Sequence, residues 1–219
     1  PSPPRFPSAP DRRRDFTYQL VFSADGSRLA ATYPADGPVT AVWRVGEGPP
    51  LAPPIAIEAA ERLTFAPDGA RLALPKVEGL TVWDLTTGGL VDLPSHSPMW
   101  PTSSAFSRDG SLAAGGYDTP GIVAVWPLRS PRSSPLILGI PDVQALAFSP
   151  DGRLLAAADA SGRTELLRIP SGLPILSLDG PPSQTSELRF SPDGSRLTRP
   201  GDRRSRSGRP TLRILSRRP

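Results

Sequence analysis

FSPDG at Phe148–Gly152 is one of five related five-residue stretches in a chain of 219 residues. An identical copy is found at Phe190–Gly194, and FSADG, FAPDG and FSRDG begin at Phe22, Phe65 and Phe106. The leading Phe recurs after 43, 41, 42 and 42 residues. A fixed period of this length indicates a repeat architecture in which each copy is one supersecondary unit. The sequence therefore predicts five structurally equivalent units.

Each unit is predicted to be a meander of four antiparallel strands. In the second copy, residues 62–66 alternate polar and apolar side chains, which is typical of a half-buried strand. Asp68-Gly69 predicts a tight hairpin, because Gly accepts the positive φ that such turns need. Third strands are expected at residues 39–45, 80–85, 122–128, 163–169 and 210–216, and fourth strands at 54–58, 90–93, 135–138 and 174–178.

The expected fold class is all-β. A single four-stranded sheet has two faces to cover, and stacking equivalent sheets around an axis buries them, which is the arrangement of a β-propeller. Long helices are disfavoured by 30 Pro and 20 Gly, and no segment has a sustained period of 3.6 residues.

These residues resemble the WD-repeat β-propeller family. A Trp closes the third strand in three copies, at Trp43, Trp83 and Trp126, and Trp83-Asp84 forms the literal Trp-Asp pair. Leu167 and Leu215 are expected at the Trp position of the last two copies. The likeness covers residues 16–216 and implies about five four-stranded blades, at roughly 16–58, 60–93, 101–138, 143–178 and 185–216.

The resemblance also bears on completeness and context. Propellers of this family commonly have seven blades, so the resemblance implies an incomplete arc of a larger propeller, with a closed five-bladed ring as the alternative. Residues 1–15, rich in Pro and Arg, are expected to be an N-terminal segment or linker, and residues 217–219 a basic tail. Similar bacterial arrays often belong to multidomain proteins, so a bacterial fragment of a larger protein is expected.

Most catalytic chemistry is disfavoured by the composition. The chain has no Cys and one His, His96, which excludes disulfides, thiolate metal sites and multi-His metal sites, so no cofactor is expected. The resemblance implies that His96 joins Asp118 and Trp126 in a hydrogen-bonded network. Structural roles are expected for Trp43, Trp83 and Trp126 inside the blades and, in the turns, for Asp25, Gly26, Asp68, Gly69, Asp109, Gly110, Asp151, Gly152, Asp193 and Gly194.

Candidate contact residues are expected where the copies differ. Trp100 lies outside the repeat register beside Met99, in the connection at residues 95–103, and Asp118 begins an unusual turn at residues 118–121. Loops on a rigid scaffold commonly carry binding residues. Trp100, Met99 and Asp118 are therefore the predicted partner contacts, with burial between blades as the alternative for Trp100.

Three functions are compatible with this scaffold. The first is a non-catalytic protein–protein interaction scaffold, and the second is a propeller enzyme or periplasmic-type propeller that binds a small ligand in its channel. The third is nucleic-acid contact through residues 196–219, which carry nine Arg and one Asp. Nucleic acid is disfavoured because that end lacks aromatic residues for base stacking. No stretch approaches the roughly 20 apolar residues of a membrane helix.

Overall fold

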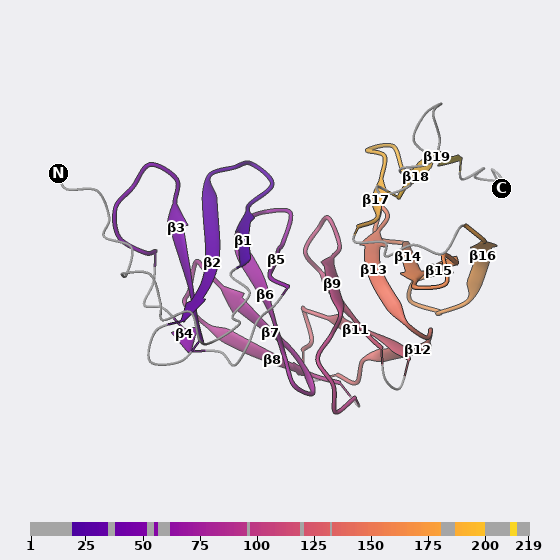
Figure 1. Ribbon diagram of the computed structural model, residues 1–219, viewed down its shortest axis with the longest axis horizontal. Helices are drawn as coiled ribbons and strands as arrows, with labels where there is room; N and C mark the ends of the chain where they lie inside the picture. The colour runs from indigo at the N-terminus through magenta and orange to yellow at the C-terminus, as the bar shows by residue number, and fades with distance from the viewer. Residues whose placement is uncertain are drawn as a thin grey trace.

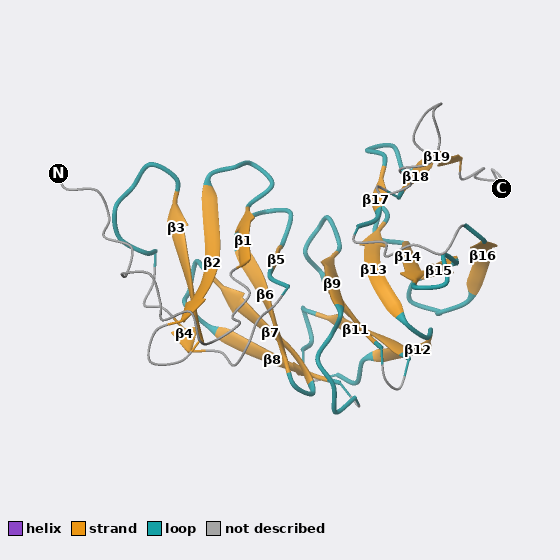
Figure 2. Ribbon diagram, in the orientation of Figure 1, coloured by secondary structure: helices purple, strands orange, loops and turns teal. Residues whose placement is uncertain are grey.

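The structure, a computed structural model, describes residues 19–34, 38–51, 55–56, 62–95, 97–118, 121–131, 133–180, 187–199 and 211–213. These residues form 19 β-strands and no helix, which confirms the all-β prediction (Figure 2). Within this part of the chain, accordingly, there is no apolar helix of membrane-spanning length.

The strands form four four-stranded antiparallel sheets and one three-stranded sheet, each a meander in chain order. The first sheet contains β1 (Gln19–Phe22), β2 (Arg28–Pro34), β3 (Pro38–Arg44) and β4 (Ile55–Ala56). The second contains β5 (Thr64–Phe65), β6 (Arg71–Lys76), β7 (Gly79–Asp84) and β8 (Leu90–Pro94). The third contains β9 (Ser103–Phe106), β10 (Leu112–Tyr117), β11 (Ile122–Pro127) and β12 (Leu136–Gly139). The fourth contains β13 (Val143–Phe148), β14 (Leu154–Asp159), β15 (Thr164–Arg168) and β16 (Pro174–Leu178), and the fifth β17 (Arg189–Phe190), β18 (Arg196–Thr198) and β19 (Thr211–Arg213).

The third strands of the first four sheets begin and end within about one residue of the predicted bounds. The fifth sheet differs from the prediction. Leu197 of β18 pairs with Leu212 of β19, so Leu212 and not Leu215 occupies the position of the Trp. The long connection before β19 made this register ambiguous in the sequence, because several Leu and Ile positions could have closed the strand.

The Asp-Gly turns explain why the first two strands of each unit fold back on each other. The turn glycines of all five copies have φ between 64° and 71°, a left-handed conformation that Gly adopts without steric cost. In the first copy, the Gly26 N–H donates to the Ser23 carbonyl at 2.9 Å. Each repeated stretch is therefore the hairpin that starts a blade.

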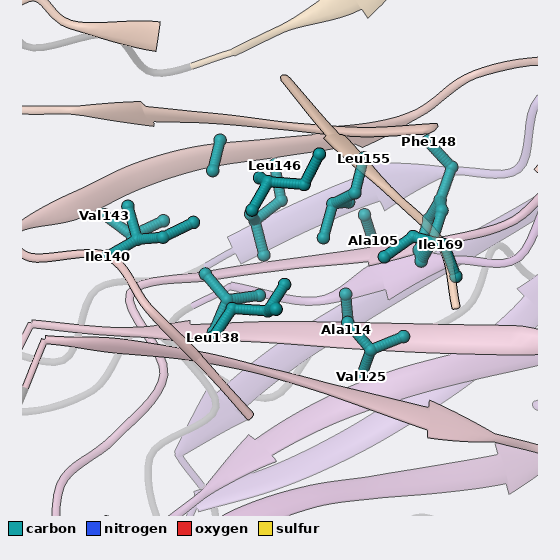
Figure 3. Packing of buried hydrophobic residues seen from close by; sticks show 13 residues of the cluster. Ala105, Ala114, Val125, Leu138, Ile140, Val143, Leu146, Phe148, Leu155 and Ile169 are labelled. Atoms are coloured by element: carbon teal, nitrogen blue, oxygen red, sulfur yellow. The ribbon is translucent and has the colours of Figure 1, made fainter. Parts of the chain in front are cut away.

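Successive sheets pack against each other in chain order (Figure 1). The first strands are spatial neighbours, so that β1 contacts β5, β5 contacts β9, β9 contacts β13 and β13 contacts β17. Each junction has its own apolar cluster, which combines side chains of two consecutive blades. Between the third and fourth blades, Phe148 and Leu155 lie in one cluster with Ala105, Ala114 and Val125 (Figure 3). Leu167 belongs to the same cluster.

The five sheets form an open array consistent with an incomplete propeller. In Figure 1 the first sheet lies at the left, the second and third follow towards the right, and the fourth and fifth lie at the right, the fifth above the fourth. The four apolar clusters of the described residues join only consecutive blades, and none joins the fifth blade to the first.

Candidate functional site

The blades present two different rims. The Asp-Gly turns join first to second strands and therefore lie on one rim, which we call the turn rim. In an antiparallel meander, the turns between second and third strands and the connections to the next blade lie on the opposite rim, which we call the loop rim. Met99, Trp100 and Asp118 all belong to the loop rim, on connections into or within the third blade.

On the turn rim, the carboxylates are held within their own turns. The Ser23 hydroxyl donates to the Asp25 carboxylate at 2.6 Å, and the Arg28 N–H donates to the Ser23 hydroxyl at 2.9 Å. The hydrogen bond from Ser23, with further bonds from Ser27, lowers the pKa of Asp25 to about 2. The Ser–Asp bond recurs at Ser107–Asp109, Ser149–Asp151 and Ser191–Asp193, and it likewise holds the pKa of Asp109 and Asp193 at about 2.

The second copy shows what the Ser contributes. Ala66 stands at the Ser position, so the bond from a Ser hydroxyl is missing. Asp68 keeps the bond from the backbone N–H two residues later, here Ala70 at 2.9 Å, as the Asp residues of the other copies do, and it also accepts from the Arg71 guanidinium at 3.1 Å. All five Asp residues are thus placed where a turn needs an acceptor. They stand one to a blade, an arrangement that stabilises turns and provides no carboxylate pair for acid–base catalysis.

The three Trp residues at the end of the third strands differ in environment. Trp83 and Trp126 are fully buried, and the Trp126 indole N–H donates to the Pro94 carbonyl at 3.0 Å. Trp43 is only half-buried, and its ring lies 6.3 Å from that of Tyr33. His96 lies outside the described residues, so the expected network of His96, Asp118 and Trp126 stays a prediction.

The connection into the third blade holds the candidate contacts. The Ser95 N–H donates to the Glu78 carbonyl at 2.6 Å, and the Met99 N–H donates to the Ser97 hydroxyl at 3.2 Å. The side chain of Met99 is 46% exposed and that of Trp100 is half-buried. The structure thus presents an exposed thioether beside a partly covered indole on a segment fixed by hydrogen bonds.

A carboxylate pair lies at the start of the fourth blade. A hydrogen bond with Asp118 and the negative charge of Asp118 raise the pKa of Asp142 above its ordinary value, and the charge of Asp159 adds to the effect. Asp142 itself has a positive φ of 51°. The sequence prediction missed Asp142. This Asp lies in the connection before β13, on the same rim as the turn between second and third strands that holds Asp118, and that shared position is the signal that could have identified it.

Thr102 connects these two features of the loop rim. Its N–H and hydroxyl both donate to the Gly116 carbonyl, at 2.7 and 3.1 Å, and the hydroxyl also contacts the Val143 carbonyl. The connection is thereby held against the end of β10 and the start of β13. Because Asp118 directly follows β10 and Asp142 directly precedes β13, they border the segment that carries Met99 and Trp100. We call these four residues the loop-rim surface: Met99, Trp100, Asp118 and Asp142.

Three other kinds of site have less support from the described residues: a metal site, a small hollow and a nucleic-acid contact. Within the described part of the chain, no three His, Cys, Asp or Glu side chains are grouped so that they could hold a metal ion. An open hollow on the turn of the fifth blade is lined by Ser191, Pro192, Asp193, Ser195 and Arg196. Its Ser and Asp side chains are already bonded within the turn. Most of the Arg-rich end lies outside the described residues, so the candidate nucleic-acid contact there stays a prediction.

Comparison with known proteins agrees with this geometry. The model of the family described as "WD domain, G-beta repeat" matches residues 139–164, which contain β13, β14 and the FSPDG turn between them. This match supports the resemblance to the WD-repeat family. It is similar to WD repeat-containing protein SL1-17 of Schistosoma mansoni, at 28% identity over 123 residues, or 56% of this chain and 40% of that protein. WD repeats generally mediate protein–protein interaction, and WD-repeat proteins are typically non-enzymatic scaffolds.

Proposed function

We propose that this WD-repeat chain is a non-catalytic protein-binding scaffold that contacts its partner through the loop-rim surface. The observation that carries the proposal is the exposed Met99 on a connection whose backbone is hydrogen-bonded to the second and third blades. A fixed segment loses little conformational entropy when a partner binds, so its apolar contacts contribute more fully to affinity. Met is unbranched and polarisable and adapts to irregular apolar surfaces.

The acidic pair gives this surface a charge preference. Asp118 is exposed and shares a hydrogen bond with Asp142, so the two carboxylates favour a proton or a cationic group between them. A partner segment that combines an apolar side chain with a nearby Lys or Arg is complementary to this arrangement. The proposed partner contact is therefore an apolar and basic protein segment.

Partner capture with matched variants tests the proposal. The full chain is immobilised, and bound proteins are compared between wild type, Met99→Ala, Trp100→Ala and Asp118→Asn. Ile175→Ala is the control, because Ile175 on β16 has the same 46% exposure as Met99 but lies on an outer strand of the fourth blade. We expect proteins captured by wild type and Ile175→Ala to be lost from Met99→Ala, with weaker capture by Asp118→Asn. Equal capture by all variants would place the contact elsewhere.

A further inference from the structure

The turn rim of the third and fourth blades carries four exposed Arg residues: Arg108, Arg129, Arg153 and Arg168. Arg108 and Arg153 belong to the Asp-Gly turns, whereas Arg129 lies just after β11 and Arg168 ends β15. In a four-stranded meander, the turn between third and fourth strands lies on the same rim as the turn between first and second strands. The four residues therefore lie on one rim of two adjacent blades, and we call them the turn-rim arginines.

Backbone hydrogen bonds hold the two turns of each blade together on this rim. In the third blade, the Leu128 N–H donates to the Ser111 carbonyl at 2.8 Å, next to Arg129. In the fourth blade, the Ile169 N–H donates to the Arg153 carbonyl, also at 2.8 Å. The two arginines of each blade are thus carried by neighbouring segments whose backbones are fixed to each other.

The turns of the two blades also abut. A Cβ placed on Gly152, in the Asp-Gly turn of the fourth blade, would lie 3.7 Å from the Cβ of Ser107 in the turn of the third blade. Farther out, a Cβ on Gly172, between β15 and β16, would lie 2.6 Å from Cδ2 of Leu138 on β12. The segments that carry the turn-rim arginines therefore form one continuous surface across the junction.

The guanidinium groups of the turn-rim arginines have no partner in the described part of the chain, where no carboxylate or carbonyl oxygen binds them. The turn rim of the first blade differs in this respect. There the Arg28 guanidinium donates to the Gly69 carbonyl at 2.6 Å, and that of Arg44 lies 3.5 Å from the Glu47 carboxylate. The unpaired arginines are thus a property of the third and fourth blades and not of the repeat as such.

The balance of charge on the rim changes between the same blades. The turns of the third and fourth blades contain five Arg and two Asp, at residues 107–112, 128–135, 149–154 and 168–173. The turns of the first and second blades contain three Arg and four acidic residues, at residues 23–28, 44–51, 66–71 and 84–89. The excess of positive charge on the third and fourth blades makes this part of the rim attractive to an anionic partner.

The two Asp residues of this surface are occupied by their own turns. Asp109 accepts from the hydroxyls of Ser107 and Ser111, at 2.7 and 2.8 Å, and Asp151 accepts from the Ser149 hydroxyl at 2.6 Å. These carboxylates reduce the positive charge of the surface but do not hold the guanidinium groups in ion pairs. The arginines are therefore available to carboxylates from outside the chain.

We propose that the turn-rim arginines bind an acidic segment of a partner protein. A guanidinium group presents a planar fork that binds a carboxylate through two parallel hydrogen bonds. Because Asp109 and Asp151 stand among the arginines, the surface suits separate carboxylates better than the dense, even charge of a nucleic-acid duplex. The four segments also contain no Phe, Tyr or Trp on which unpaired bases could stack.

This proposal goes beyond the proposed function, because it concerns the opposite rim and the opposite charge. The loop-rim surface carries Asp118 and Asp142 and is complementary to a basic segment, whereas the turn-rim arginines select an acidic one. A scaffold with these two rims can hold two segments of opposite charge at once. Met99→Ala should therefore bind an acidic peptide as tightly as wild type, so the two proposals can fail independently.

Binding of a fluorescently labelled poly-glutamate peptide to the full chain, followed by anisotropy, tests the proposal. We expect the double variant Arg129→Gln/Arg153→Gln to bind the peptide about tenfold more weakly than wild type, because each Arg contributes a charge-assisted hydrogen bond. Its melting temperature should be unchanged, since these side chains have no described partner. The variant Arg129→Lys/Arg153→Lys should have an intermediate affinity, because Lys keeps the charge without the fork.

Two further double variants remove the same net charge elsewhere and serve as controls. Arg44→Gln/Arg189→Gln replaces exposed arginines that are already in ion pairs with acidic side chains. Arg203→Gln/Arg204→Gln removes charge from the Arg-rich end, which also attracts an acidic peptide. We expect each control to weaken binding less than about twofold, as for a general change in net charge that is screened by salt.

Hydrogen exchange locates the bound peptide. Exchange at residues 128–135 and 168–173 should slow when the peptide is added to wild type, and it should not slow in Arg129→Gln/Arg153→Gln. The proposal is overturned if either control loses as much affinity as that variant, or if the variant binds like wild type. It is also overturned if duplex DNA or anionic lipid vesicles bind the turn-rim arginines more tightly than the peptide, since the partner would then be a nucleic acid or a membrane.

Discussion

Trp126 of the third blade and Trp43 of the first occupy the same position of the repeat and differ in burial. Both close a third strand, and each pairs with the residue three positions after the Gly of its Asp-Gly turn. Trp126 is fully buried and donates a hydrogen bond to the Pro94 carbonyl, whereas Trp43 is half-buried beside Tyr33. Trp126 packs in a cluster with residues of the second blade, such as Ala66, Ala73 and Leu80. The difference therefore arises from the neighbouring blade and not from the strand itself.

This comparison distinguishes the stability that a single blade has from its own turns from the stability that neighbouring blades add. A blade forms its hairpins from local turn chemistry, which is nearly the same in the first and third copies. Its apolar faces are covered only by adjacent blades, as expected for repeat proteins in which each unit contacts its neighbours. Substitutions of the Trp residues that close the third strands should thus reveal whether a neighbouring blade covers them, while substitutions in the turns should not.

Trp126→Ala should give the largest contrast with its counterpart in the first blade. Removing a fully buried Trp leaves a cavity and an unpaired Pro94 carbonyl, so we expect the free energy of unfolding to fall by about 3–5 kcal/mol. Trp43→Ala should cost about 1–2 kcal/mol because its side chain is already half-exposed. Urea unfolding followed by circular dichroism measures both. Equal losses would mean that the two residues share the same degree of cover in solution.

Gly116→Ala should disrupt the junction between the third and fourth blades, because it adds a methyl group on the third-blade side. A Cβ on Gly116 would lie 2.5 Å from Cγ1 of Val143, which belongs to the fourth blade. Overpacking of this kind costs about 1–3 kcal/mol in unfolding free energy. Gly139→Ala is the control, since a Cβ there would meet no atom within 4 Å. Thermal unfolding of the two variants should differ clearly, and a similar melting temperature would contradict the packing described for this junction.

Arg71→Leu should remove the bond that ties the second turn to the third. Its guanidinium donates to the Gly110 carbonyl and is partly exposed, so we expect a loss of about 1 kcal/mol in unfolding free energy. Arg153→Leu, on the exposed side of the fourth turn, should change the unfolding free energy by less than that. If both variants unfold at the same urea concentration as wild type, the Arg bridge adds nothing to the junction in solution.

The sequence predicted the blades well because their signals are local. Alternating side chains and Asp-Gly turns define each hairpin within a few residues, and the third strands followed from the same period. Burial of Trp43 could not be predicted, since it depends on a neighbour that the strand does not encode. The pairing of Asp118 with Asp142 joins loops of two blades, and only the packing of β10 beside β13 brings them together. The prediction that Leu215 occupies the Trp position was wrong, because a long connection obscured the register of β19, in which Leu212 pairs with Leu197.

Asp25→Asn and Asp109→Asn should have small and equal effects on stability. We expect this although Arg71 of the second blade contacts the turn of Asp109, whereas no described blade precedes the turn of Asp25. Hydrogen bonds from the preceding Ser hydroxyls hold the pKa of both carboxyls at about 2, below the ordinary 3.8. A lowered folded-state pKa means that the stabilisation is complete above pH 3.8 and is lost as the pH falls towards 2. Each Asn variant should therefore flatten the fall in melting temperature between about pH 4 and pH 2 to the same extent. A larger change at Asp109 than at Asp25 would show that the second blade, through Arg71 and Gly110, also supports the carboxylate, and the turn chemistry would then not be local.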